Sequence, residues 1–336
     1  GLRRLRASLG VPGEFPAEVL DEAERSSAHP VLPSRDCTDI EFVTIDPAGS
    51  TDLDQAFHLS RVGSGYLLRY AIADVAAFVT PGGLVDAEAQ RRGETLYAPT
   101  SRTPLHPAVL SEGATSLLPG QVRPALIWEL QLDESGRTTA ARVERGLVRS
   151  RAQLTYTGAQ ADLDAGRGGE QLELLRVIGQ LRLALEAARG GVSLRVPEQE
   201  VAATDVAWEL EYRAPLAVED WNAQLSLATG MAAADLMLEA GVGILRTLPP
   251  ARDSSLAKLR RTAAALGITW RQSMAYPEFV RSLDASRPAQ AAMLNACTLL
   301  FRGAGYEAFS GRPPEQPLHA AIGASYAHTT APLRRL

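Results

Sequence analysis

The residue pattern that predicts secondary structure changes character near residue 156. Between residues 40 and 151, β-branched and aromatic residues gather in short segments bounded by Gly, Pro or Asp, which is typical of strands. Four such segments cover residues 41–46, 66–74, 125–132 and 138–148. Beyond residue 156 the apolar residues recur at helical spacing instead. We therefore predict an α/β (mixed α+β) fold, with a strand-rich first half and a helix-rich second half.

The second half contains four predicted helices. One is marked by apolar residues three or four positions apart, namely Leu174, Ile178, Leu181 and Leu185. The others cover residues 218–240, 256–266 and 288–301. The helix at 256–266 is expected to take Asp253 or Ser254 as its N-cap, because a short polar side chain accepts from the first free backbone N–H groups.

Composition excludes several classes of protein. The 336 residues are 46% hydrophobic and 22% charged, so the chain is neither disordered nor fibrous. Its longest apolar stretch, residues 231–248, is broken by Asp235, Glu239 and Arg246, which argues against a membrane span. The two cysteines, Cys37 and Cys297, have neither metal-site nor disulfide-framework spacing. We expect a cytoplasmic protein with no membrane partner.

The net charge of −5 hides an uneven distribution. Residues 241–336 hold 12 basic and 5 acidic residues, a net charge of +7, which leaves −12 for residues 1–240. Such asymmetry suggests that one end meets an anion while the other gathers carboxylates. All basic residues except Lys258 are arginine, a side chain suited to phosphate, although a GC-rich genome is the better explanation because the bias runs through the whole chain.

Three aspartates follow the first predicted strand. The strand ends at Asp46, Pro47-Ala48-Gly49-Ser50 forms a tight turn, and Asp52 and Asp54 follow two residues apart. In an extended segment these two side chains point to the same side, so a turn returning on the strand end would aim three carboxylates at one point. Clustered carboxylates repel unless a cation neutralises them, and hard oxygen ligands suit magnesium or manganese.

Two other interpretations of this loop stay open. Its spacing partly resembles a calcium loop, but it lacks the twelve-residue pattern with a terminal glutamate. Aspartates also often cap turns without binding anything. The spacing alone does not decide among the three.

The loop resembles the signature of the ribonuclease II family, whose RNB catalytic domain carries the pattern T-I-D-x-x-x-x-x-D-x-D-D-A. Further segments resemble that family's later blocks in the same order: residues 71–75, 85–89, 92–97, 116–120, 154–156, 218–220 and 326–335. The last of these, Tyr-Ala-His-Thr-Thr-Ala-Pro-Leu-Arg-Arg, is similar to the family's Y-x-H-F-T-S-P-I-R-R. The resemblance runs from Arg35 to the end of the chain. It implies a helical lead-in and linker over residues 1–35 and an RNB domain over 36–336, built around a central RNA channel.

The resemblance implies a magnesium-dependent, processive exoribonuclease. Family members remove nucleoside 5′-monophosphates from the 3′ end of single-stranded RNA by hydrolysis. Magnesium, or manganese in its place, would be held by Asp46, Asp52 and Asp54, the last also being catalytic. Arg334 and Arg335 would neutralise the charge that builds on the phosphate.

Three more residues match family positions that contact RNA. Tyr97 and Tyr156 would stack on bases near the 3′ end, although a lone tyrosine usually packs in a core. Glu219 would bind a ribose hydroxyl, a route to preferring RNA over DNA, although a glutamate in a helix's first turn also favours the helix dipole. His319 and His328 are interpreted as positioning residues.

The chain departs from the family pattern in two ways. The paired aspartates that end the loop are Asp54-Gln55 here, so one metal position should bind more weakly or through water. This indicates either a subfamily with altered metal demand or an impaired enzyme. The chain also stops one residue after Arg335, without S1-type or cold-shock barrels, so we expect it to be part of a longer protein.

Three hypotheses follow. The first is a magnesium-dependent exoribonuclease, most simply a monomer, whose acidic part carries the metal and whose basic part lines the RNA path. The second is an RNB domain that binds RNA without cutting it, because Gln55 has removed catalysis. The third is an unrelated metal-binding or regulatory domain.

Overall fold

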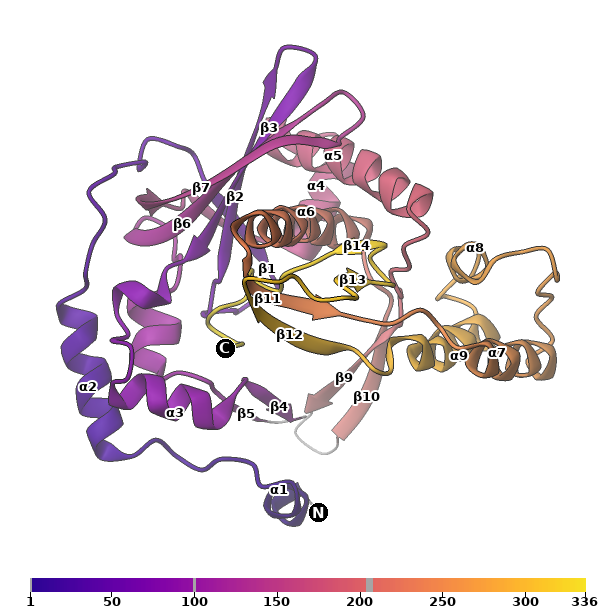
Figure 1. The fold of residues 1–336 in the computed structure, drawn as a ribbon, viewed down its shortest axis with the longest axis horizontal. Coiled ribbons are helices and arrows are strands. Elements are labelled where there is room, and N and C mark those ends of the chain that lie inside the picture. Colours follow the sequence, from indigo (N-terminus) through magenta and orange to yellow (C-terminus); the bar gives the residue numbers. More distant parts are fainter. Residues whose placement is uncertain (1, 99–100, 204–207) are drawn as a thin grey trace.

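A six-stranded sheet forms the centre of the molecule in the computed structural model, which describes residues 2–98, 101–203 and 208–336 (Figure 1). The strand order is β7-β6-β3-β2-β1-β8, and only β1 and β8 run parallel. The strands are β1 (Val43–Asp46), β2 (Gln55–Val62), β3 (Gly65–Ala73), β6 (Val122–Leu132), β7 (Thr138–Arg149) and β8 (Ala152–Thr155).

Three helices cover one face of this sheet: α4 (Tyr156–Asp164), α5 (Gly169–Ala188) and α6 (Ala217–Ala240). The largest core lies between them and includes Tyr70 of β3 and Trp128 of β6. Helices α5 and α6 approach closely at Gly179, where a Cβ atom would lie 2.3 Å from the Cβ of Trp221. Only glycine therefore permits this helix pair to pack as it does.

The opposite face of the sheet packs against connecting loops and the end of the chain. A second core joins Phe42, Leu53 and Leu117 to Leu333, which lies three residues before the last residue, Leu336. Helix α2 (Ala17–Ala28) packs on α3 (Leu84–Arg92) and a π-helical turn. The remaining elements here are α1 (Leu2–Ser8), η1 (Val75–Ala77), β4 (Leu96–Ala98), β5 (Ser101–Thr103) and the π-helical turn η2 (Val109–Ala114).

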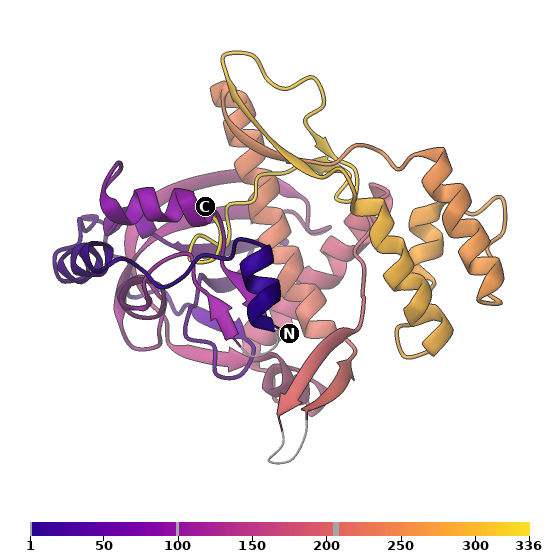
Figure 2. The same cartoon turned by 90° about the horizontal axis from the view of Figure 1, so that it is seen from below.

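A lobe of short helices with its own core projects from the sheet domain (Figures 1 and 2). It contains α7 (Asp253–Ala265), α8 (Tyr276–Arg281), α9 (Pro288–Cys297) and η3 (Thr298–Phe301). Three two-stranded sheets accompany it: β9 (Glu198–Ala203) with β10 (Trp208–Arg213), β11 (Val242–Thr247) with β12 (Gly305–Ser310), and β13 (Leu318–His319) with β14 (Ala324–Ser325).

The chain's last segment crosses α6 at Gly230. The Ala327 N–H donates to the Gly230 carbonyl over 2.9 Å, and a Cβ atom on Gly230 would lie 2.2 Å from the Tyr326 ring. This close crossing directs residues 328–335 back towards β1 and β2. The last residues of the chain therefore lie beside the aspartate loop at residues 46–54.

The mixed α/β class and the division into a strand-rich and a helix-rich half are confirmed. The four predicted strands correspond to β1, β3, β6 and β7, whereas β2 and the paired strands after α5 were not predicted. The capping prediction for α7 was wrong: Asp253 is its first residue, and the N-cap is Arg252 without a side-chain bond. None of the helices in the described part of the chain has the length and apolar character that a membrane crossing requires. The boundary at residue 35 stays a prediction.

Candidate active site

The aspartate loop is a reversal between β1 and β2. These strands pair antiparallel, with Val43 opposite Phe57, and Gly49 in the loop has a φ of 81° that favours glycine. Leu53 is fully buried and anchors the loop. The Ser116 hydroxyl accepts from the Leu53 N–H (2.9 Å) and donates to the Thr51 carbonyl (2.7 Å). The loop is therefore held by its backbone, and its side chains have fixed starting points.

Asp54 is paired with the end of the chain. Its Oδ1 accepts from the Leu333 N–H (2.7 Å) and its Oδ2 from Arg334 Nε (2.6 Å). The carboxylate is 1% exposed, and the Arg334 side chain is 38% exposed. Burial raises the pKa of Asp54 to about 6, although Arg334 and the Leu333 N–H oppose the rise. Burial lowers the pKa of Arg334, but the Asp54 carboxylate raises it overall, so the guanidinium stays charged.

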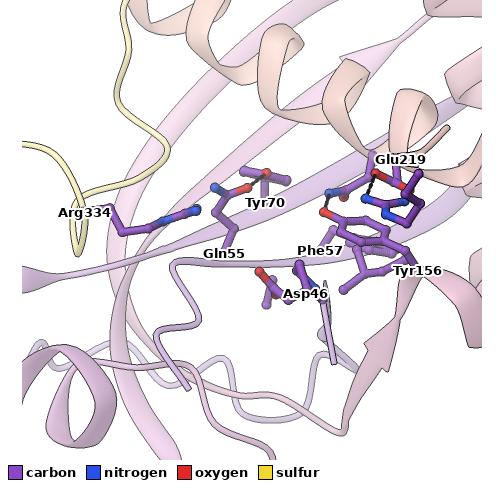
Figure 3. A pocket seen from close by; sticks show the side chains of 12 residues that line it. Asp46, Gln55, Phe57, Tyr70, Tyr156, Glu219 and Arg334 are labelled. Atoms are coloured by element: carbon purple, nitrogen blue, oxygen red, sulfur yellow. Dashed lines mark hydrogen bonds and ion pairs between the residues drawn. The ribbon is translucent and has the colours of Figure 1, made fainter. Parts of the chain in front are cut away.

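A pocket of about 260 Å³ opens beside this pair. Figure 3 shows Arg334 and Gln55 on one side and Tyr156 and Glu219 on the other, with Asp46 between them. The remaining lining residues are Ile45, Pro47, Ala56, Phe57, Tyr70, Arg213 and Asn222. Three strands of the central sheet, strand β10, two helices and the last residues of the chain thus contribute side chains to one small pocket.

Asp46 is the loop carboxylate that lines this pocket. Burial raises its pKa to about 7, Arg334 opposes the rise, and Asp54 and Asp52 add to it. Among the described residues, no group donates a hydrogen bond to Asp46 or forms an ion pair with it. Asp46 therefore offers its oxygens to whatever enters the pocket.

Gln55 occupies the position where the ribonuclease II pattern has an aspartate. It is the first residue of β2, and its amide oxygen accepts a hydrogen bond from the buried Tyr70 hydroxyl. The Ser226 hydroxyl in turn contacts Tyr70 and lies 2.7 Å from the Thr330 hydroxyl. The one oxygen that Gln55 can offer a cation is therefore already an acceptor within the protein.

Tyr156 reaches the pocket because β1 and β8 run parallel. Asp46 pairs with Thr155, which caps α4 by accepting from the Gly158 N–H, so Tyr156 begins the helix directly beside Asp46. Its hydroxyl accepts from Asn222 Nδ2 over 3.2 Å. Burial and the Asp46 charge raise the pKa of Tyr156 to about 12, so its hydroxyl stays neutral.

Glu219 is neither a solvent-facing residue nor a free one. Its Oε1 accepts from Arg213 Nη1 (2.5 Å) and from the Leu216 N–H (3.0 Å), and Oε2 accepts from Arg213 Nη2 (3.2 Å). It therefore caps α6 and lines the pocket at once. A ribose hydroxyl at this point would meet a carboxylate that Arg213 already orients.

Asp52 and Tyr97 lie beyond the pocket lining, on the side of β4 and β5. Arg102 Nη1 is 3.4 Å from Asp52 Oδ1, and its Nη2 is 2.5 Å from Glu112 Oε1. Tyr97 is 64% exposed, and burial together with the Asp52 charge raises its pKa, although a hydrogen bond between its side chain and Arg334 opposes the rise. Tyr97 is thus a largely exposed ring in contact with Arg334, whereas Asp52 is held by Arg102.

Arg335 points away from Asp54, although it follows Arg334 directly. The Thr95 N–H donates to the Arg334 carbonyl over 2.8 Å, and Glu94 and Arg335 form an antiparallel bridge. Arg335 Nη1 consequently lies 3.7 Å from Glu94 Oε2. The structure brings Arg334 to the pocket and places Arg335 in a surface ion pair.

The sequence profile of the RNB domain matches residues 34–336. The chain belongs to the RNB domain family. One relative, ribonuclease R of Acidithiobacillus ferrooxidans, is 37% identical over 162 residues, which are 46% of this chain and 36% of the relative. Among solved structures, Mycoplasma genitalium RNase R in complex with ribose-methylated single-stranded RNA superimposes with a TM-score of 0.85 at 22% identity, covering 99% of this chain and 54% of that one.

A second solved structure with this fold is yeast Ssd1, described as a pseudonuclease. It superimposes with a TM-score of 0.71 at 18% identity, covering 91% of this RNB domain and 40% of that chain. The chain spans about a third of the curated relative's length and about half of the RNase R structure's. At these identities the structural matches establish the fold of this RNB domain.

The carboxylates of this RNB domain do not converge as the spacing predicted. In the described residues no group of three or more His, Cys, Asp or Glu side chains is placed to hold a metal ion. Asp52 is paired with Arg102, and both oxygens of Asp54 already accept hydrogen bonds. Magnesium often takes only one or two carboxylates and completes its shell with water and substrate phosphate. The residues fit such a site: Asp46, which has no hydrogen-bond or ion-pair partner among the described residues, would be the direct ligand, and the charge of Asp54 would add to the attraction.

Several residues of the site were not predicted from the sequence. Tyr70 and Ser226 lie within ordinary strand and helix patterns, and only the fold shows that they connect to Gln55. Arg213 and Arg102 are two among many arginines. For Asn222 a signal was available, because it stands one helical turn after Glu219 and therefore shares its side of α6.

Proposed function

We propose that this RNB domain is the catalytic part of a 3′-to-5′ exoribonuclease that acts on single-stranded RNA. The observation that carries the proposal is the Asp54–Arg334 pair beside the open carboxylate of Asp46, in a pocket that Tyr156 also lines. Relatives that share the domain are named ribonucleases, and the RNase R match was solved with single-stranded RNA.

Arg334 would bind the scissile phosphate. Its Nε is occupied by Asp54, which fixes the guanidinium plane, while the side chain remains about two-fifths exposed towards the pocket. A cation held in this way stabilises charge on a phosphate without having to reorganise. Asp54 thus acts on the phosphate by orienting Arg334.

The remaining residues would hold the 3′-terminal nucleotides. Tyr156 offers a ring on the pocket wall and Tyr97 an exposed ring at its edge, and stacking on either tolerates any base. Glu219 would accept from a ribose hydroxyl, which DNA lacks at the 2′ position. Magnesium or manganese, held by Asp46 with Asp54 and Asp52 nearby, would act as a Lewis acid on the phosphate and lower the pKa of an attacking water.

Further properties belong to the same proposal. The enzyme would release nucleoside 5′-monophosphates processively from RNA threaded through a channel, act as a monomer, and work in the cytoplasm. The basic residues 241–336 would attract the RNA backbone, since Lys and Arg that neutralise phosphates release condensed counterions.

The test is a 5′-labelled single-stranded RNA of about thirty nucleotides, followed on a sequencing gel. We expect a ladder that shortens from the 3′ end in magnesium, disappears in EDTA, and is absent with DNA of the same sequence. Asp54→Asn should abolish the ladder, whereas Asp21→Asn, an exposed carboxylate of α2, should leave it unchanged. A ladder in the Asp54→Asn protein would refute the assignment.

A second candidate function is RNA binding without cleavage. It is favoured by one observation: the Gln55 oxygen already accepts a hydrogen bond from Tyr70, so the position offers a cation no charge and only one oxygen that is partly engaged. RNA that shifts in a binding gel but stays intact in magnesium and in manganese would select this function. In that case Asp46→Asn should not weaken RNA binding.

A further inference from the structure

A second cavity lies between α5, α6 and the turn that joins β6 to β7. Its volume is about 440 Å³, and none of its lining residues belongs to the candidate active site. Along α6, Asn222 lines the first pocket and Met231 the second. Nine residues of helix separate them by roughly 13 Å at 1.5 Å per residue. The two spaces are distinct. Figure 1 shows α5 and α6 side by side, with β14 next to α6.

One of the residues that line this cavity is a buried arginine. Arg182 of α5 is 3% exposed, and its Nη1 donates to the Gly136 carbonyl (3.0 Å) and to Thr138 Oγ1 (3.2 Å). Its Nε is buried without an acceptor, and no carboxylate in the described ranges lies within ion-pair distance. Burial and, to a smaller extent, the charge of nearby Arg189 lower the pKa of Arg182 to about 10. A buried guanidinium without a counter-charge is unfavourable unless an anion joins it.

Two more arginines line the same cavity. Arg189, at the end of α5, donates from Nε to the Ile322 carbonyl (3.2 Å), and its Nη2 is buried without an acceptor. Arg137, on the β6–β7 turn, is exposed at the rim. Burial lowers the pKa of Arg189, and the Arg137 charge lowers it as well, although Glu186 opposes both effects.

The carboxylates near the cavity compensate these arginines only in part, through the effect of Glu186 on Arg189. Asp235 of α6 lies on the exposed rim and forms no ion pair with a described residue. Glu186 turns to the other side of α5, where its Oε2 accepts from Gln224 Nε2 over 2.6 Å. Three arginines and one aspartate therefore give the cavity a net charge of +2.

We propose that this cavity binds a small phosphate monoester of about nucleotide size, with Arg182 and Arg189 holding the phosphate group. Guanidinium groups match phosphate oxygens in geometry and charge. The volume lies within the range of ligand pockets and exceeds what an isolated oxyanion fills. Leu185, Met231 and Ala232 supply an apolar wall for the organic part of the ligand. The proposal does not rest on the exoribonuclease activity.

Isothermal titration calorimetry in EDTA tests the proposal on the Arg334→Gln protein, whose candidate active site has lost its phosphate-binding cation. The titrants are adenosine 5′-monophosphate, ribose 5-phosphate, inorganic phosphate and adenosine. We expect the two phosphate monoesters to bind, inorganic phosphate to bind more weakly, and adenosine not to bind. Equal affinities for adenosine and its monophosphate would overturn the role of the arginines.

Two further substitutions place the ligand. Adding Arg189→Gln or Arg182→Gln should weaken monophosphate binding at least about tenfold, because each removes charge-assisted hydrogen bonds. Arg176→Gln, an exposed arginine of α5 paired with Glu173, is the matched control and should change nothing. If Arg182→Gln does not fold, the test rests on the half-buried Arg189. Unchanged monophosphate binding in Arg189→Gln would refute the proposal, and so would the absence of monophosphate binding to the Arg334→Gln parent.

Discussion

Replacing Gln55 by aspartate tests whether position 55 decides how firmly the site holds a cation. The change adds a carboxylate to the pocket that Asp46 already faces, and it shortens the side chain so that the bond from Tyr70 is lost. Gln55→Asn is the matched control, since asparagine has the same shape as aspartate, loses the same bond, and carries no charge. The difference between the two variants therefore isolates the charge.

Without a cation, the added charge should destabilise the protein. Burial already raises the pKa of Asp46 to about 7, and that of Asp54 to about 6 in spite of Arg334 and the Leu333 N–H, so the pocket has little capacity to compensate a further negative charge. Two unit charges about 6 Å apart repel by about 3 kcal/mol at an effective dielectric constant of about 20. Partial protonation relieves some of this repulsion. In EDTA at pH 8 we expect Gln55→Asp to unfold with a free energy about 1–3 kcal/mol lower than Gln55→Asn.

Magnesium should reverse the order of the two variants. A dication is attracted to the new carboxylate about twice as strongly as a single charge is repelled, and desolvation offsets much of this gain. We expect magnesium to bind Gln55→Asp at least about tenfold more tightly than Gln55→Asn, a difference of about 1.4 kcal/mol. Calorimetric titration with magnesium measures this directly, and thermal unfolding in EDTA and in magnesium checks the sign.

Turnover of the labelled RNA connects this result to function. If wild-type protein binds RNA without cutting it and Gln55→Asp produces a ladder, then Gln55 is what removed catalysis. Equal magnesium affinities for the Asp and Asn variants, together with equal stabilities in EDTA, would refute the reasoning. The pocket would then not be the place where a cation is held.

Three other predictions follow from the same contacts. Arg334→Gln should reduce turnover at least about a hundredfold on the RNA gel, because it removes the cation beside Asp54. His106 is 4% exposed, and burial lowers its pKa to about 4. The neutral imidazole therefore contributes its full share to the free energy of unfolding above about pH 6.5, and that free energy falls by roughly 3 kcal/mol towards pH 4. Urea titrations should show this pH dependence, and it should be absent in His106→Gln. Ser116→Ala leaves the buried Leu53 N–H unpaired and should lower the unfolding free energy by about 1–3 kcal/mol in the same titrations.

Local sequence patterns were sufficient for the regular elements. The segments at 125–132 and 138–148 correspond to the hairpin β6–β7, because turn residues and alternating burial are local properties. Helix α6 was likewise predicted within one residue at its start. Pairings between distant segments were not predicted: β11 pairs with β12 across about sixty residues, and nothing in either segment specifies its partner.

For the candidate site, the sequence predicted which residue types are present better than it predicted where their side chains point. Arg334 and Arg335 are adjacent and chemically alike, but an antiparallel bridge to Glu94 turns the second away from the pocket. Asp46, Asp52 and Asp54 are close in sequence, but Arg102, which comes from β5, holds Asp52 apart. In each case the residue that sets the side-chain orientation lies in a distant segment of the sequence, so local spacing could not predict it.

The geometry of the site indicates an order in which its charges are satisfied. Asp54 is already bound by Arg334 and a backbone N–H, so part of its charge is compensated within the protein before a cation binds. Of the three loop aspartates, Asp46 is the one without a hydrogen-bond or ion-pair partner among the described residues, and one carboxylate makes a weak magnesium ligand unless a phosphate adds further oxygens. RNA would therefore complete the metal site by bringing its phosphate to Arg334. Because coupling between two ligands is reciprocal, magnesium should then tighten RNA binding by the same factor as RNA tightens magnesium binding.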